Sequence, residues 1–156
     1  MSGSPLVSVI MPVYNGVLYI CEAISSILNH ALAGKTFAIY GDGNQNKDFL
    51  HTNDLPHTVI KSVESDVVGE VFQIASGRET TVNELTEKVK RLAKEYIKRL
   101  VEVRYESAGK GEIYKNVADV SKARRIIVYK PQVSLEKGLE ETLAWFQSMN
   151  GQISII

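Results

Sequence analysis

The sequence lacks a second cysteine, an excess of one charge and a long apolar run, and each absence excludes a class of protein. Cys21 has no partner for an internal disulfide, and we expect it to be a small buried side chain in a helix. Lys plus Arg total 18 and so do Asp plus Glu, so no overall field favours nucleic acid or an anionic membrane surface. No stretch approaches the ~20 apolar residues that cross a bilayer, and no leader pattern precedes one. We therefore expect a cytoplasmic protein that binds neither nucleic acid nor membrane.

What the sequence does contain is an alternation of strand-like and helix-like segments. Its hydrophobic content of 44% is ample for one core, so we predict a single compact α/β domain. Thr81 and Glu84 have the spacing of a capping box, and Asp54, Ser121 and Ser134 are expected to cap three further helices. Trp145 and Phe146 are expected to be packing residues of the last helix. The predicted strands are residues 6–13, 37–40, 70–75, 101–105 and a tail at 152–156; the predicted helices are 20–31, 54–64, 81–100, 121–125 and one from 134 onward.

Four blocks of sequence occur in the same order as in a known family. They are residues 39–49, residues 69–77, residues 111–113 with 118–123, and residues 129–131 ahead of the helix that ends in Trp145 and Phe146. They resemble the C-terminal region of extended short-chain dehydrogenase/reductases that act on nucleotide sugars, of the UDP-glucose 4-epimerase type. This resemblance implies a partial Rossmann-like parallel sheet joined to the small C-terminal substrate-binding region of these enzymes.

The first residues resemble a different family. Residues 7–16, with the helix that follows them, are similar to the opening of a family 2 glycosyltransferase. We therefore divide the chain into a strand-helix segment at 1–32 and an epimerase-like region at 33–150. The join is physically reasonable, because an epimerase also places a buried strand and a crossover helix before this region.

The epimerase resemblance also implies chemistry that this sequence does not carry. Such enzymes need a glycine-rich turn at a helix N-terminus, and a tyrosine followed four residues later by lysine. None of the seven tyrosines has that spacing, and the glycine pairs at 41 and 43 and at 109 and 111 lack a third glycine at the right distance. We therefore expect that the chain holds no cofactor, although the family uses NAD, that it supplies no catalytic residue, and that it is inactive alone.

The sequence also lacks the residues expected for metal-dependent glycosyl transfer, as it lacks those for NAD-dependent epimerisation. That reaction normally uses a metal held by an Asp-x-Asp pair, which does not occur here. Asp42 and Asp48 remain an alternative pair, but acidic residues in such loops more often bind turn amides. His51, Asp54 and His57 are interpreted as a helix cap and two ordinary histidines. We therefore predict no metal site.

Four residues are candidates for substrate binding, all by resemblance. Lys47 stands where the family usually has an arginine directed at the diphosphate, and it keeps the charge but loses the planar fork. Gly109 occupies the place of a second basic contact, so Lys110 beside it is a displaced charge. Glu112 matches the acidic residue that meets the nucleotide ribose, and Asn15 matches an amide that faces the phosphates. The simpler alternatives are two surface charges, a solvent-facing acid and a turn residue.

Three alternative functions are consistent with these features of the sequence. The first is a UDP-sugar-binding fragment that either forms homo-oligomers or needs a separate dinucleotide-binding half. The second is a remnant of a family 2 glycosyltransferase. The third is a non-catalytic interaction module or fusion product that keeps the fold without a ligand.

Overall fold

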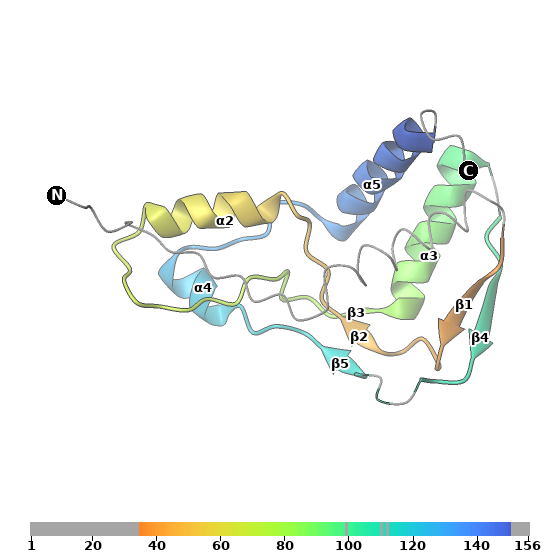
Figure 1. Cartoon of the computed structure of the whole chain (residues 1–156), viewed down its shortest axis with the longest axis horizontal. Helices are drawn as coiled ribbons and strands as arrows, with labels where there is room; N and C mark the ends of the chain where they lie inside the picture. The colour runs from red at the N-terminus through yellow and green to blue at the C-terminus, as the bar shows by residue number, and fades with distance from the viewer. Residues whose placement is uncertain (1–34, 99, 110, 112, 151–156) are drawn as a thin grey trace.

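The computed structural model describes residues 35–98, 100–109, 111 and 113–150 (Figure 1). The predicted strand at 6–13, helix at 20–31 and tail strand at 152–156 lie outside these residues, and so does Cys21.

Two small sheets, both with parallel pairing, make up the strands of the structure. In one sheet, β1 (Phe37–Tyr40) pairs in parallel with β4 (Val103–Glu106). In the other, β2 (Asn46–Lys47) lies between β3 (Thr80–Thr81), which is antiparallel to it, and β5 (Lys115–Asn116), which is parallel. The helices are α2 (Asp54–Val63), α3 (Val82–Leu92) with the π-helical turn η1 (Ala93–Ile97), α4 (Ser121–Ile126) and α5 (Leu135–Asn150). The predicted α/β class is confirmed.

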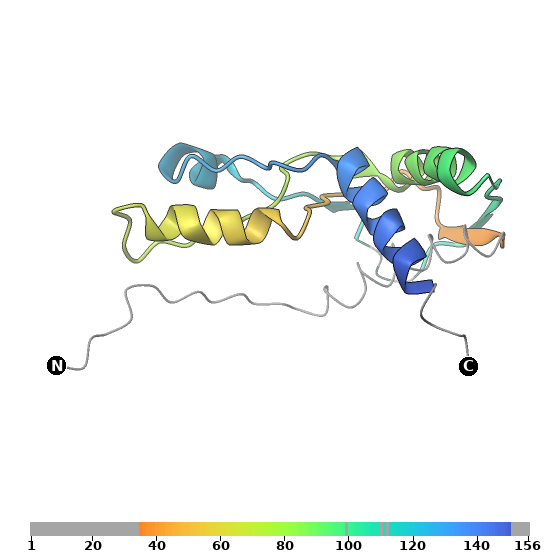
Figure 2. The ribbon, with the colours of Figure 1, turned by 90° about the horizontal axis from the view of Figure 1, so that it is seen from above.

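The elements are spread along one long axis. Helices α2 and α4 lie at one end, and α3 lies beside β1 and β4 at the other, with β2, β3 and β5 between them (Figures 1 and 2). The segment from β1 to β4 crosses over through α3, as parallel pairing requires, because parallel neighbours cannot be joined by a tight turn. The β2–β3–β5 sheet therefore lies between the part that contains α2 and α4 and the part that contains α3, β1 and β4.

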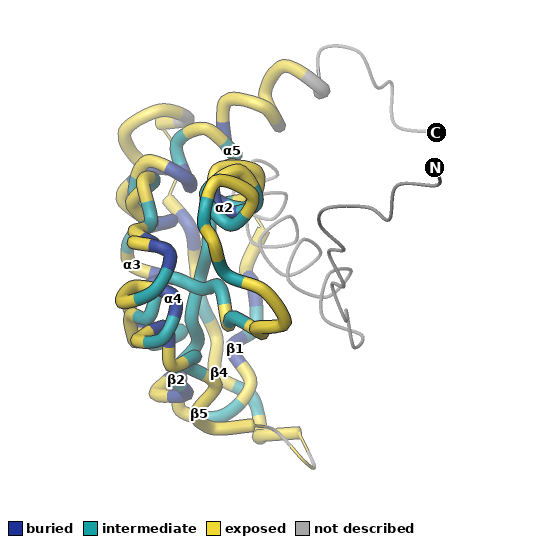
Figure 3. The backbone as a smooth tube through the Cα atoms, turned by 90° about the vertical axis from the view of Figure 1, so that its left-hand side faces the viewer, coloured by how far each residue is buried: buried dark blue, intermediate teal, exposed yellow. Residues whose placement is uncertain are grey.

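The core consists of three separate clusters. Figure 3 shows which stretches of the backbone are buried. The first joins α3 to α5 and contains Leu85, Val89, Leu92, Leu139 and Leu143. The second packs β1 and β4 against α3 and η1, and contains Phe37, Ile39, Ala93 and Val101. The third surrounds α4 and contains Val120, Ala123, Ile127 and Tyr129. Leu85, Val89 and Leu92, which recur along one side of α3, are the contribution of this helix to the first cluster.

Helix α3 begins with the predicted capping box. The Thr81 hydroxyl accepts a hydrogen bond from the Glu84 amide at 3.0 Å, and the Glu84 carboxylate accepts one from the Thr81 amide at 2.9 Å. Two N–H groups that have no partner inside the helix are thereby satisfied. The predicted end at residue 100 is too late, since the α-helix ends at Leu92 and η1 closes on Lys98, whose φ is 57°.

The strand predicted at residues 70–75 is wrong. This segment forms no ladder with the other described strands. It runs over α4, where Phe72, Ile74 and Ala75 pack against the third cluster, and the Ala75 carbonyl accepts a hydrogen bond from the Tyr129 hydroxyl at 2.7 Å. Its apolar residues are thus buried by a helix and not by strand pairing.

Two of the predicted helix caps are also corrected. Asn53 precedes α2 without a side-chain cap, whereas Asp54 is buried inside the first turn. The Asp54 carboxylate accepts hydrogen bonds from the amides of Gln132 at 2.8 Å and Val133 at 3.4 Å, so it joins α2 to the chain ahead of α5. At α4 the Ser121 amide donates to Asp119 at 2.9 Å, so the capping side chain lies two residues earlier than predicted.

Helix α5 begins as predicted, and its tryptophan lies at the surface of the helix. The Ser134 hydroxyl accepts a hydrogen bond from the Lys137 amide at 3.2 Å, which is a capping contact. Trp145 is 55% exposed, so it is not part of the buried core. The side chain of Phe146 is not among those that the structure describes.

Candidate functional site

Lys47 lies at the centre of the three-stranded sheet. It is the second residue of β2, opposite Thr80 of β3 and Asn116 of β5. Its ammonium group donates a hydrogen bond to the Ile113 carbonyl at 2.8 Å, across 66 positions of sequence. An ammonium group has three N–H donors, so this contact positions the charge and leaves capacity for an anion. Lys47 is half-buried, as suits a positioned cation more than a freely moving one.

Asp48 fixes the strand that carries Lys47. One of its carboxylate oxygens accepts from the Ser76 amide at 2.8 Å and from the Ser76 hydroxyl at 2.5 Å. The other accepts from the Gly77 amide at 2.9 Å and the Ala118 amide at 3.4 Å. Because the carboxylate is occupied by these donors, it serves as a structural anchor and not as the metal ligand weighed from sequence.

The turn between β1 and β2 is fixed by side chains on both sides. The Asp42 carboxylate accepts from the backbone amide of Asn44 at 2.9 Å and from its side-chain amide at 3.0 Å, and these bonds lower the pKa of Asp42. Gly43 has φ of 72°, and a Cβ there would lie 2.0 Å from the Asn83 Oδ1 atom. Asn83 in turn donates to the Asp42 carbonyl at 3.0 Å and accepts from the Tyr105 hydroxyl at 3.0 Å.

The other three predicted ligand contacts, Asn15, Lys110 and Glu112, lie outside the described residues. The Ile113 carbonyl that Lys47 binds follows Glu112 directly in the sequence. Sequence patterns alone did not suggest this long-range contact.

The two histidines near α2 do not form a cluster. His51 Nε2 lies 3.5 Å from the Glu141 carboxylate on α5, and His57 Nδ1 lies 2.8 Å from the Asn53 carbonyl. Within the described residues, no group of three or more His, Cys, Asp or Glu side chains is arranged to hold a metal ion.

The described residues do not fit a dinucleotide cofactor. A dinucleotide's pyrophosphate is normally held by a glycine-rich turn that runs from a strand directly into a helix N-terminus. The turn after β1 instead runs into β2. Its Gly41 amide donates to the Glu106 carbonyl at 2.9 Å, and its Asn44 amide donates to the Asp42 carboxylate at 2.9 Å. We therefore derive no chemical step through NAD from this part of the chain. In the same described part, no helix is long and apolar enough to span a membrane.

Comparisons with known proteins place the chain among sugar-nucleotide enzymes. A model of the family described as GDP-mannose 4,6 dehydratase matches residues 12–142. A UDP-N-acetyl-alpha-D-glucosaminuronate decarboxylase of Bacillus cytotoxicus is 31% identical over 129 residues, which are 81% of this chain and 40% of that protein. The family match includes residues 12–32, for which the glycosyltransferase resemblance stays a prediction.

Two solved structures have a similar fold. A UDP-glucose 4-epimerase of Thermotoga maritima with UDP-glucose superposes with a TM-score of 0.71 at 31% identity, over 82% of this chain and 40% of that one. A dTDP-glucose 4,6-dehydratase of Bacillus anthracis in complex with NAD gives 0.68 at 27% identity, over 80% of this chain and 38% of that one.

The chain thus spans about 40% of the length of the relatives it matches. Because the family model matches well over half of the chain, and structures of related enzymes share its parallel pairing, the chain belongs to the GDP-mannose 4,6 dehydratase family and is related to the UDP-sugar epimerases and dehydratases.

Proposed function

We propose that this chain is the nucleotide-sugar-binding part of an epimerase or dehydratase, and that Lys47 contacts the diphosphate of a UDP-sugar. The observation that supports this proposal best is the hydrogen bond from Lys47 to the Ile113 carbonyl at 2.8 Å. Ile113 directly follows Glu112 in the sequence, and the family resemblance assigns a further nucleotide contact to Glu112. The solved relative from Thermotoga maritima, crystallised with UDP-glucose, makes a UDP-sugar the first ligand to test.

The contact energies set the size of the expected effect. A charge-assisted hydrogen bond to a phosphate oxygen contributes about 1.5 to 3 kcal/mol when water is excluded. Lys47 is half-buried, so the lower part of that range applies to it. Lysine also lacks the planar fork with which arginine binds two oxygens at once, so we expect weaker binding than in relatives that carry arginine there.

Turnover requires groups that the described residues do not supply. We propose that the chain does not epimerise or dehydrate a sugar alone, and that a separate dinucleotide-binding half, or a second copy, covers the edge of β1 that has no described neighbour. In the described residues β1 pairs with β4 only, and an unpaired strand edge favours addition of another strand. Mass spectrometry of the purified native protein tests this proposal, which a retained NAD molecule would contradict.

Substitution of Lys47 tests the binding site itself. We expect Lys47→Ala to weaken UDP binding by roughly ten-fold in a chemical-shift titration at fixed, modest salt. Lys47→Arg is expected to strengthen binding, because it restores the bidentate contact. The matched control is Lys61→Ala, since Lys61 also donates from its ammonium group to a backbone carbonyl, that of Val128, at 3.1 Å, but on α2.

Equal UDP affinity in the wild type and in the Ala and Arg variants at position 47 would remove Lys47 from the site. If UDP binding requires a divalent metal ion, the result favours the glycosyltransferase alternative. If neither UDP nor NAD binds, the non-catalytic alternative is favoured.

A further inference from the structure

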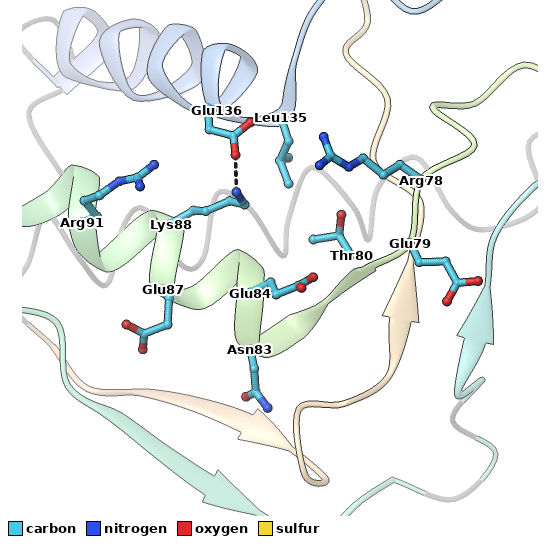
Figure 4. Close-up of a pocket in the computed structure, with 10 residues that line it drawn as sticks. All are labelled: Arg78, Glu79, Thr80, Asn83, Glu84, Glu87, Lys88, Arg91, Leu135 and Glu136. Atoms are coloured by element: carbon cyan, nitrogen blue, oxygen red, sulfur yellow. Dashed lines mark hydrogen bonds and ion pairs between the residues drawn. The ribbon is translucent and has the colours of Figure 1, made fainter.

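A cavity that the proposed UDP-sugar site does not use lies between α3 and the start of α5 (Figure 4). Its volume is about 650 Å³, which is enough for a small metabolite. Its wall on α3 carries Lys88 and Arg91, its wall on α5 carries Leu135 and Glu136, and Arg78 closes the end ahead of β3.

Every carboxylate around this cavity already has a partner. The four bind as follows: Glu79 to Lys115 at 2.5 Å, Glu84 to the Thr81 amide at 2.9 Å, Glu87 to Lys90 at 2.7 Å, and Glu136 to Lys88. The hydrogen bond from Lys88, with the charge of Arg78 as a smaller contribution, lowers the pKa of Glu136. Three of the four carboxylates are thus paired with a lysine ammonium group, and Glu84 is held by a backbone amide.

The two arginines differ from these acids. Within the described part of the chain, neither the Arg78 nor the Arg91 guanidinium forms a hydrogen bond or an ion pair. They lie at opposite ends of the cavity, and both side chains extend toward Leu135 and Glu136 (Figure 4). Each guanidinium keeps five N–H donors in a planar fork, an arrangement that matches the oxygens of a phosphate or a carboxylate.

The space between the two arginines is complementary to the uncharged, polar middle part of a ligand. The Lys88–Glu136 ion pair crosses this space and carries no net charge. Asn83 and Thr80 add polar side chains and Leu135 an apolar one, so the wall is mixed and not a single-sign surface. A ligand with charge at both ends and hydroxyl groups in the middle is complementary to this arrangement.

We propose that this cavity binds a small organic anion with an oxyanion group at each end, of the sugar bisphosphate class, with one end on Arg78 and the other on Arg91. The inference does not depend on the proposed UDP-sugar site, since Lys47 is not among the residues that line the cavity. The requirement for two ends distinguishes it from general attraction of anions to exposed arginines.

The test is a titration of the full chain with fructose 1,6-bisphosphate, and with fructose 6-phosphate as the one-ended probe, at about 0.1 M ionic strength. We expect the bisphosphate to bind at least ten-fold more tightly than the monophosphate, and Arg78→Gln and Arg91→Gln each to weaken it about ten-fold. Both variants should keep the wild-type melting temperature, because neither guanidinium has a bond to lose. Arg125→Gln, which removes an exposed arginine from α4, is the matched control and should change nothing.

Unchanged binding in both cavity variants, equal binding of the two probes, or no binding at millimolar concentration would each overturn the inference. An Arg125→Gln effect as large as that of the cavity variants would do the same, because it would show unspecific attraction. Lys47→Ala separates the two sites. Loss of bisphosphate binding in that variant alone places the anion at the UDP-sugar site and contradicts the cavity, whereas loss of UDP binding alone leaves the cavity proposal intact.

Discussion

Two regions of this molecule are stabilised by different kinds of interaction. In the anchored region, which comprises β2, residues 70–77 and α4, side chains bind the backbone directly, as Asp48 does with Ser76 and Gly77. In the crossover region, which comprises β1, α3, η1 and β4, a parallel ladder and an apolar cluster provide most of the contacts. The anchored region satisfies its irregular backbone within the chain, whereas the crossover region has a strand, β1, with one described neighbour.

This difference bears on which part of the chain would accept a further strand. In the anchored region β2 already lies between β3 and β5, and the Asp48 carboxylate binds backbone amides, so we expect no strand to add beside Lys47. A parallel pair is normally part of a wider sheet with both faces covered. Under the proposed function, the crossover region is therefore the place where we expect a separate dinucleotide-binding half, or a second copy, to add.

The largest effect should come from removing the anchor. Asp48→Ala leaves the amides of Ser76 and Gly77 without their acceptor, and we expect a loss of about 3 kcal/mol in the free energy of unfolding. Urea denaturation gives the value directly. Asp66→Ala is the control, because Asp66 is exposed and has no bond within the described residues, and it should change stability by less than about 0.5 kcal/mol. A loss at Asp48 as small as this would contradict the anchoring role.

A smaller loss in the free energy of unfolding, which depends on pH, is expected when Tyr129 is replaced. Burial raises the pKa of its phenol to about 12, with the nearby charges of Asp54 and Asp48 adding to the shift. A raised pKa means that the contribution to stability is fully present below about pH 10 and is lost as the pH rises toward 12. Tyr129→Phe, which loses the bond to the Ala75 carbonyl, should cost about 1 to 1.5 kcal/mol at neutral pH.

The measurement for Tyr129 is urea denaturation of both proteins at several values between about pH 7 and pH 11, bracketing the ordinary tyrosine pKa of 10.0. The difference in the free energy of unfolding between the wild type and Tyr129→Phe should become smaller above the ordinary tyrosine pKa. A difference that stays constant would show that the phenol does not titrate differently in the folded state.

The smallest change is expected at the start of α3 in the crossover region. Thr81→Ala removes one half of the capping box, which typically costs about 1 kcal/mol. The exposed Thr52 has no side-chain bond in the described part of the chain, so Thr52→Ala serves as the control. Thermal denaturation compares the two, and equal melting temperatures for both variants would show that the capping box adds no stability.

Local signals in the sequence predicted only some of the regular elements. The capping box of Thr81 and Glu84 depends on neighbouring residues only, and the structure confirms it, whereas the short strands β2, β3 and β5 were not predicted. The apolar run at 70–75 misled, because the pattern of a strand does not reveal whether a partner strand exists. Its burial against α4 depends on residues about fifty positions away, which no local pattern specifies.

The candidate site was predictable only in part, for the same reason. Resemblance identified Lys47, but its bond to Ile113 joins residues 66 positions apart. The charged side chains of α3 contribute Lys88 to an ion pair with Glu136 and Arg91 to a cavity, and neither contact was predicted from the sequence. Such features arise from the packing of α3 against α5, and the spacing of charges along one helix does not contain that information.

Hydrogen–deuterium exchange with and without saturating UDP tests the central claim most directly, because it reports where in the chain the ligand acts. If the anchored region holds the nucleotide through Lys47, amides of β2 and β5, such as Asn46, whose amide donates to the Tyr114 carbonyl at 2.7 Å, should exchange more slowly with UDP. Amides of β1 and β4 should exchange at the same rate in both conditions. Protection confined to β1 and β4, or unchanged exchange throughout β2 and β5, would contradict the account.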